Sequence, residues 1–128
     1  MKEIEKIVEK LKSCEKIMAE EKGPFDLFGL FLRDDAPDKW DLVIAGEWIE
    51  KDADESFFYV IDMLTRGLPK EDMLKLSRVV VLKKKNPDLE AMYRAIGGGR
   101  NIRIKDSIFF GLQIKEAYII TLRRRGSK

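Results

Sequence analysis

The sequence predicts an α+β fold: a single mixed β-sheet of about five to six strands with helices packed on it. Stretches with apolar residues three and four positions apart, typical of amphipathic helices, alternate with short, nearly continuous apolar stretches typical of buried strands. The predicted strands come in adjacent pairs near both ends of the chain, which argues against a strictly alternating parallel sheet. The 128 residues show no internal repeat or linker, so we expect one domain over residues 1–122 and a basic, solvated tail over 123–128.

The first predicted element is an amphipathic N-terminal helix over residues 2–22. Its apolar side chains recur at helical spacing with Lys and Glu between them, and Gly23 with Pro24 ends it. The apolar stripe consists of Ile4, Ile7, Val8, Leu11, Cys14, Ile17 and Met18. We expect it to pack on the sheet, because the helix has fewer heptads than a coiled coil usually needs.

Two strands are predicted next, over residues 25–32 and 40–45. Both are apolar on each face, which is typical of central strands, and the segment between them is short enough for a hairpin connection. Asp52 with Glu55 three residues later has the pattern of a capping box, which predicts the start of a second helix. Gly67 and the proline that follows it at position 69 end this helix.

The second half continues with a short helix over residues 70–76 and a third buried strand over 79–82. Asn86 followed by Pro87 predicts the start of another helix, because Asn caps helices well and Pro fits the first helical turn. This helix ends at the glycines that begin with Gly97. The remaining apolar segments are expected to be strands, the last two of them antiparallel: residues 102–104, 108–114 and 117–122.

Composition excludes several classes of protein and of site. With 45% apolar and 38% charged residues, no apolar run near ~18 residues and a charged N-terminus, we expect an ordered cytoplasmic protein rather than a disordered, secreted or membrane protein. Cys14 is the one cysteine, so no internal disulfide forms. The absence of histidine excludes Ser/His/Asp triads and His-containing zinc sites. Side-chain amides are few beside Lys, Arg and Glu, a balance that suggests a thermophilic source.

Charge is unevenly distributed along the chain. Residues 1–64 contain nine Lys and Arg and 17 Asp and Glu, a net charge of −8, whereas residues 65–128 contain 16 and six, a net charge of +10. Two interpretations follow. Either the halves neutralise each other within the fold or across a dimer, or the basic half presents a surface to an anionic partner.

Several basic residues of the second half are candidates for an anion-binding surface. If they share one face they form a stripe for phosphate groups, with Tyr93 as a stacking partner for a base. No recognised nucleic-acid-binding signature accompanies them. The candidates are Lys83, Lys84, Lys85, Arg94, Arg100, Arg103 and Lys105.

An acidic segment offers a metal site as the alternative. Asp34 and Asp35 lie at the end of one predicted strand, Asp41 at the start of the next and Glu47 beyond it, and carboxylate oxygens are the ligands that Mg²⁺ or Mn²⁺ prefer. However, at ~3.3 Å per residue Asp41 and Glu47 lie roughly 20 Å apart along a strand, and Asp and Pro are also common in turns. A solvated turn is the interpretation that we favour.

Three hypotheses about function result. The first is a small non-catalytic interaction domain, a homodimer without a cofactor, that binds nucleic acid or another anionic partner through its basic second half. The second is a metal-dependent phosphoesterase or nuclease that uses the acidic segment. The third is an assembly subunit with no ligand, whose charge asymmetry serves only association.

Overall fold

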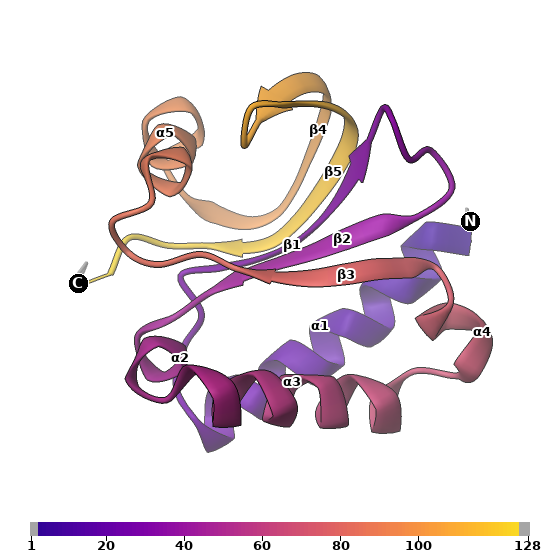
Figure 1. Cartoon of the computed structure of the whole chain (residues 1–128), viewed down its shortest axis with the longest axis vertical. Coiled ribbons are helices and arrows are strands. Elements are labelled where there is room, and N and C mark those ends of the chain that lie inside the picture. The colour runs from indigo at the N-terminus through magenta and orange to yellow at the C-terminus, as the bar shows by residue number, and fades with distance from the viewer. Residues whose placement is uncertain (1–2, 126–128) are drawn as a thin grey trace.

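The computed structural model describes residues 3–125 and confirms the α+β class, with five helices and one mixed five-stranded sheet in this part of the chain (Figure 1). The N-terminal amphipathic helix and the C-terminal antiparallel strands are both present. In chain order the elements are α1 (Glu3–Glu21), β1 (Leu27–Arg33), β2 (Trp40–Ala45), α2 (Glu47–Lys51), α3 (Ala53–Gly67), α4 (Lys70–Met73), β3 (Leu76–Val81), α5 (Pro87–Ile96), β4 (Gly99–Phe109) and β5 (Leu112–Leu122).

The sheet has the strand order β3-β2-β1-β5-β4. β1 is the central strand and pairs antiparallel with β2 and with β5, and β4 extends the sheet beyond β5, also antiparallel. β2 and β3 run parallel, as their connection through α2, α3 and α4 allows. The segment from β1 to β2 is therefore the hairpin that the sequence predicts, and both of these strands are buried almost throughout.

Helices cover both faces of the sheet, as Figure 1 shows: α1 and α3 lie on one face and α5 on the other. The first face packs one hydrophobic core, in which Leu11 of α1 and Leu64 of α3 are fully buried against Leu42 of β2. The second core lies between α5 and the opposite face of the sheet and contains Phe31 and Met92. On this side the β4–β5 hairpin curls over the sheet toward α5.

Local sequence signals explain several element ends. The Asn86 side chain accepts a hydrogen bond from the backbone N–H of Asp88, and Pro87 is the first helical residue, so the predicted cap of α5 is confirmed. The predicted capping box at Asp52 is wrong, because α3 begins after Asp52 without a side-chain hydrogen bond at its cap. The short helix α2, which we did not predict, turns the chain immediately before this point.

Two strand predictions also need correction. Residues 79–82 were expected to form a buried strand, but β3 is an edge strand and only partly buried, because nothing pairs with its outer side among the described residues. Residues 108–114 do not form one strand, since the chain reverses at Phe110 and Gly111 between β4 and β5. Both errors have the same origin: an apolar run does not show where the chain turns or which strands flank it.

The basic tail is anchored where the structure describes it. Arg125 donates hydrogen bonds to Asp26 and Glu50, and the backbone N–H of Arg123 donates to the carbonyl of Asp26. The expectation of a solvated tail is therefore wrong at Arg125, and residues 126–128 lie outside the described part. No helix within residues 3–125 is long and apolar enough to cross a membrane.

Candidate functional site

The acidic segment after β1 forms the turn into β2. Asp34 and Asp35 are exposed in this turn, whereas Asp41 is a buried residue of β2 and Glu47 begins α2 at the other end of that strand. The structure thus separates Asp41 from Glu47. Within residues 3–125 no group of three or more acidic or cysteine side chains could hold a metal ion.

Asp41 is instead the centre of a charge cluster on the α5 face of the sheet. Its side chain is 5% exposed, and its Oδ2 lies 3.1 Å from Nε of Arg33 and 3.2 Å from Nε of Arg78. Register explains this meeting. Asp41 pairs with Arg78 across the parallel β2–β3 ladder and with Phe31 across the antiparallel β1–β2 ladder, and Arg33 follows two residues after Phe31 on the same face of β1. Oδ1 of Asp41 is buried and has no hydrogen-bond partner among the described residues. The cluster therefore holds one unsatisfied buried acceptor.

A cavity of about 170 Å³ lies beside this cluster. Its floor is the sheet, and it is enclosed by the start of α5 and by the curled β4–β5 hairpin. Arg78, whose side chain is 52% exposed, is the most open of the cluster residues and marks the side where solvent reaches it. The apolar lining consists of Phe31, Val43, Val80, Leu82, Phe110, Leu112 and Ile114, and the polar lining of Arg33, Asp41, Arg78, Asn86 and Asp88.

Phe110 is held in an unusual backbone conformation at the wall of this cavity. Its φ of 59° and that of Gly111, 70°, form the tight turn between β4 and β5. The left-handed region is natural for glycine but costs a bulky residue on the order of 1–3 kcal/mol. In this position the Phe110 ring contacts the Phe31 ring edge to face, with centroids 5.2 Å apart. The strained backbone at Phe110 therefore places its ring against Phe31, and the two rings form an aromatic wall of the cavity beside the Asp41 cluster.

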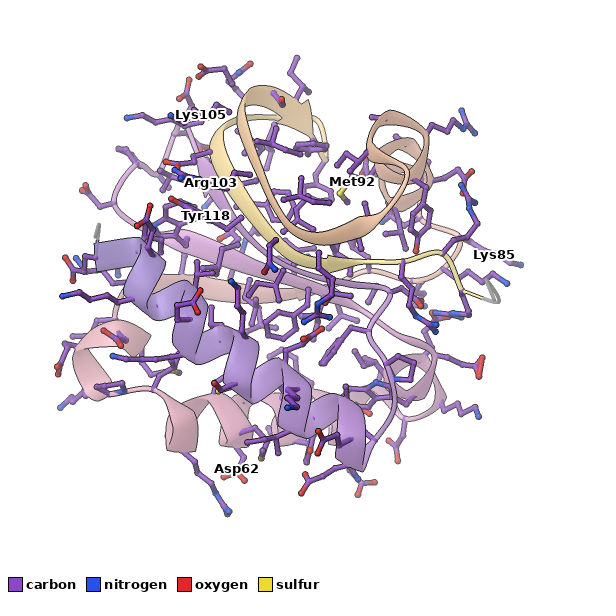
Figure 2. All side chains as sticks on the ribbon, turned by 180° about the vertical axis from the view of Figure 1, so that it is seen from behind. Asp62, Lys85, Met92, Arg103, Lys105 and Tyr118 are labelled. Carbon is purple, nitrogen blue, oxygen red and sulfur yellow. The ribbon has the colours of Figure 1, made fainter. Side chains whose placement is uncertain are left out.

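The arginines expected to bind anions are paired with carboxylates. Arg100 lies 3.1 Å from Glu15, whose side chain is almost completely buried, and also donates to Thr121. Arg103 donates to Glu116 and lies over the Tyr118 ring, 4.7 Å from its centroid. Figure 2 shows Arg103 and Tyr118 next to each other. Arg94 is exposed and lies 3.7 Å from Glu90, one turn earlier in α5. These three charges are already compensated within the fold.

The lysines expected to bind anions are exposed but dispersed. Lys83, Lys84 and Lys85 lie in the connection from β3 to α5, and the backbone N–H of Lys84 donates to Glu50. Lys105 lies on β4, where it pairs in register with Glu116. Figure 2 shows Lys85 on the opposite side of the molecule from Lys105 and Arg103. The structure therefore does not bring the two groups into one stripe.

Part of the charge asymmetry is neutralised by ion pairs between the two halves of the chain. Within residues 3–125, six ion pairs join a basic residue after position 74 to an acidic residue before position 51. Arg125 illustrates this, because burial acts to lower its pKa but its hydrogen bonds to Glu50 and Asp26 raise the pKa overall. Part of the charge asymmetry is therefore compensated within the fold.

A second cavity, of about 210 Å³, lies between α1 and β4. Its polar residues include Glu5, Arg103 and Tyr118, and Arg103 lies 3.5 Å from Glu5. Burial and the neighbouring Glu116 raise the pKa of Tyr118 to about 12, so this phenol stays protonated at neutral pH. The charged groups Glu5 and Arg103 are paired with each other, although the buried Tyr118 hydroxyl has no hydrogen-bond partner among residues 3–125. Because this cavity has no buried ionised group without a partner, it is a weaker candidate than the one beside Asp41.

Arg33, Arg78 and Phe110 were not among the candidate residues chosen from the sequence. One signal for Arg78 was present: it directly precedes an apolar β-branched run and has the same alternation as Val80 and Leu82, which belong to the core on the α5 face. A charge on a face that is otherwise buried needs a partner, and Asp41 has the same property in β2.

Comparison of the chain with models of protein families, with curated proteins and with solved structures finds no match. The geometry of the chain itself is therefore the basis for inferring function.

Proposed function

We propose that the protein is a non-catalytic binding domain that takes a small ligand with an anionic group into the cavity beside Asp41. The observation that carries the proposal is the charge cluster of Arg33, Asp41 and Arg78 on the wall of an apolar cavity. Such a cluster does not serve stability well, because apolar residues at buried ion pairs usually stabilise a fold at least equally. A ligand with complementary charge accounts for its presence.

Arg78 supplies the site for the anionic group. Its Nε lies 3.2 Å from Oδ2 of Asp41, and about half of the side chain is exposed, so the guanidinium group can also reach a ligand. The paired N–H donors of a guanidinium group match the geometry of a carboxylate or a phosphate. Because Asp41 fixes the direction of the side chain, less conformational entropy is lost when a ligand binds.

These contacts favour a small anionic ligand over the nucleic acid expected from the sequence. Arg94, Arg100 and Arg103 are paired with glutamates, and the exposed lysines do not converge. A labelled single-stranded oligonucleotide is expected to bind only in the non-specific range, with a Kd of about 1 μM or weaker at about 0.2 M salt. Substantially tighter binding at that salt concentration would favour the polyanion surface instead.

The proposal is tested with 3-phenylpropionate, which joins a carboxylate to a ring. We expect a saturable shift of backbone amide resonances around the cavity with a Kd of about 1 mM, the range for a probe of this size. Arg78→Gln should weaken binding about tenfold, because it removes a charge-assisted hydrogen bond. Arg94→Gln is the matched control and should leave the Kd unchanged. Unsaturable shifts, or an equal loss in both variants, would leave the assembly subunit without a ligand as the better explanation.

We also propose that the protein is a homodimer. Phe58 projects from α3 with 71% of its surface exposed, and the edge strand β3 carries the half-buried Val79 and Val81. An unpaired apolar strand edge is a ready surface for association. Light scattering after size exclusion should give about twice the chain mass of 14.9 kDa, and Phe58→Glu should give the monomer. Glu55→Gln is the control, and a monomeric unaltered protein would contradict the proposal.

A further inference from the structure

We infer that the ligand of the cavity beside Asp41 is a free α-amino acid with an apolar side chain of about the size of a phenyl or isobutyl group. This inference rests on the proposed function and adds the chemical class of the ligand. Three features of the cavity support it: an unsatisfied acceptor, the adjacency of opposite charges, and the size and polarity of the enclosed space.

The unsatisfied acceptor is Oδ1 of Asp41. It is buried and has no hydrogen-bond partner within residues 3–125, while Oδ2 of the same carboxylate contacts both Arg33 and Arg78. A buried acceptor without a partner is costly, and Asp41 lines the cavity, so rotation of its carboxylate toward a ligand that supplies a donor is favoured. A carboxylate oxygen accepts most strongly from a cationic donor, which makes an ammonium group the best match.

Opposite charges lie side by side at the edge of the cavity. Asp41 and Arg78 are direct partners across the β2–β3 ladder, so an acceptor and a guanidinium group are presented by neighbouring residues. A ligand that binds both needs its own positive and negative groups close together. An α-amino acid has this arrangement, because one carbon atom carries both the ammonium and the carboxylate group.

The enclosed space sets the size and polarity of the side chain. A dry cavity of about 150 Å³ accepts benzene, so a cavity of about 170 Å³ has room for a side chain of similar size. Apart from the charge cluster, Asn86 and Asp88, the lining is apolar, and it includes the Phe110 and Phe31 rings, which pack edge to face and suit a planar apolar group. A single residue with a phenyl or isobutyl side chain therefore fits, whereas a second residue would extend into solvent.

The unaltered protein can test the inference with four probes compared by calorimetry or NMR titration. These are L-phenylalanine, 3-phenylpropionate without the amine, 2-phenylethylamine without the carboxylate, and N-acetyl-L-phenylalanine with an uncharged amide. L-Phenylalanine is expected to bind at least tenfold more tightly than each of the others, because each lacks one charge-assisted contact.

The outcomes separate this inference from the proposed function. If 3-phenylpropionate or N-acetyl-L-phenylalanine binds as tightly as L-phenylalanine, the ammonium site is wrong while the anion-binding function stands. If none of the carboxylate probes binds, the proposed function fails as well. Because no substitution is involved, these comparisons do not depend on whether a variant folds.

Substitutions then test whether Asp41 binds the ammonium group and Arg78 binds the carboxylate group of the ligand. Asp41→Asn should remove the preference for L-phenylalanine over 3-phenylpropionate, and Arg78→Gln should weaken both probes about tenfold. Val80→Phe keeps both charges but fills the cavity, so it should abolish L-phenylalanine binding. Arg94→Gln is the control and should change nothing. Unchanged L-phenylalanine binding by a folded Val80→Phe protein would place the ligand elsewhere and overturn the inference.

Discussion

Replacing Asp41 by Asn is expected to destabilise the fold by about 3 kcal/mol, whether or not a divalent metal is present. The substitution keeps the shape of the side chain but removes the charge that compensates two guanidinium groups, whose Nε atoms lie 3.1 and 3.2 Å from Oδ2. Removing one partner of a buried pair costs about 3–5 kcal/mol. The low end applies because the side chains of Arg33 and Arg78, 21% and 52% exposed, can be partly hydrated.

Urea denaturation and thermal unfolding measure this change. For a chain of this length about 3 kcal/mol corresponds to a decrease of about 10 °C in Tm. Asp34→Asn is the matched control, since Asp34 is exposed in the same acidic segment, and it should stay within about 0.5 kcal/mol of the unaltered protein. A Tm that rises with Mg²⁺ or Mn²⁺ and loses this dependence in Asp41→Asn would refute the reasoning and restore the metal site. An Asp41→Asn protein as stable as the unaltered one in EDTA would also refute it.

Three further predictions concern pH and packing. Burial is the main cause that raises the pKa of all three tyrosines, Tyr59, Tyr93 and Tyr118, to about 12. Their contribution to the free energy of unfolding should therefore persist up to pH 10 and be lost between pH 10 and 12. Absorbance at 295 nm that rises near pH 10 in the native protein would contradict this. Burial acts to raise the pKa of Glu50, but its contacts with Arg125 and the Lys84 amide lower it overall from 4.5. Its contribution is therefore present above pH 4.5 and lost as the pH falls through the lowered folded-state pKa. Glu50→Gln should cost about 0.5–1 kcal/mol at pH 7 in urea unfolding, and this cost should shrink as the pH falls below 4.5. A pH-independent cost would argue against the ion pair. A Cβ at Gly67 would lie 2.4 Å from Sγ of Cys14, so Gly67→Ala should destabilise the fold by about 1–3 kcal/mol in urea unfolding. Adding Cys14→Ala should recover most of this loss. No recovery in the double variant would show that the strain arises elsewhere.

The helices were predictable because their signals are local. Apolar spacing along α1 reflects the face that one helix buries, and Asn86 with Pro87 reflects hydrogen bonding within a few residues of a helix end. The failure at Asp52 shows the limit of such signals. There α2 ends directly before α3, and the backbone of Asp52 has φ of −151° and ψ of 77°, in which its side chain makes no cap hydrogen bond.

Strand ends and edges were less predictable because they depend on distant segments. The run from Ile108 to Ile114 is apolar on both sides of the turn at Phe110, so hydrophobicity alone gives no sign of the reversal. The apolar run of β3 resembles a central strand, yet tertiary structure places it at the edge. Burial there comes from α3 and the sheet faces rather than from a neighbouring strand on each side.

Composition and periodicity alone were sufficient to determine the class of fold, the number and kind of most elements, and the exclusion of histidine chemistry. The candidate site was decided by tertiary structure, because Arg33, Asp41 and Arg78 come from three strands and only strand order and register bring them together. The same holds for charge. Sequence shows an acidic and a basic half, whereas the ion pairs that neutralise them, such as Arg100 with Glu15, join residues far apart along the chain. Electrostatic energy depends on distance in space, and the sequence order of two charges does not specify that distance.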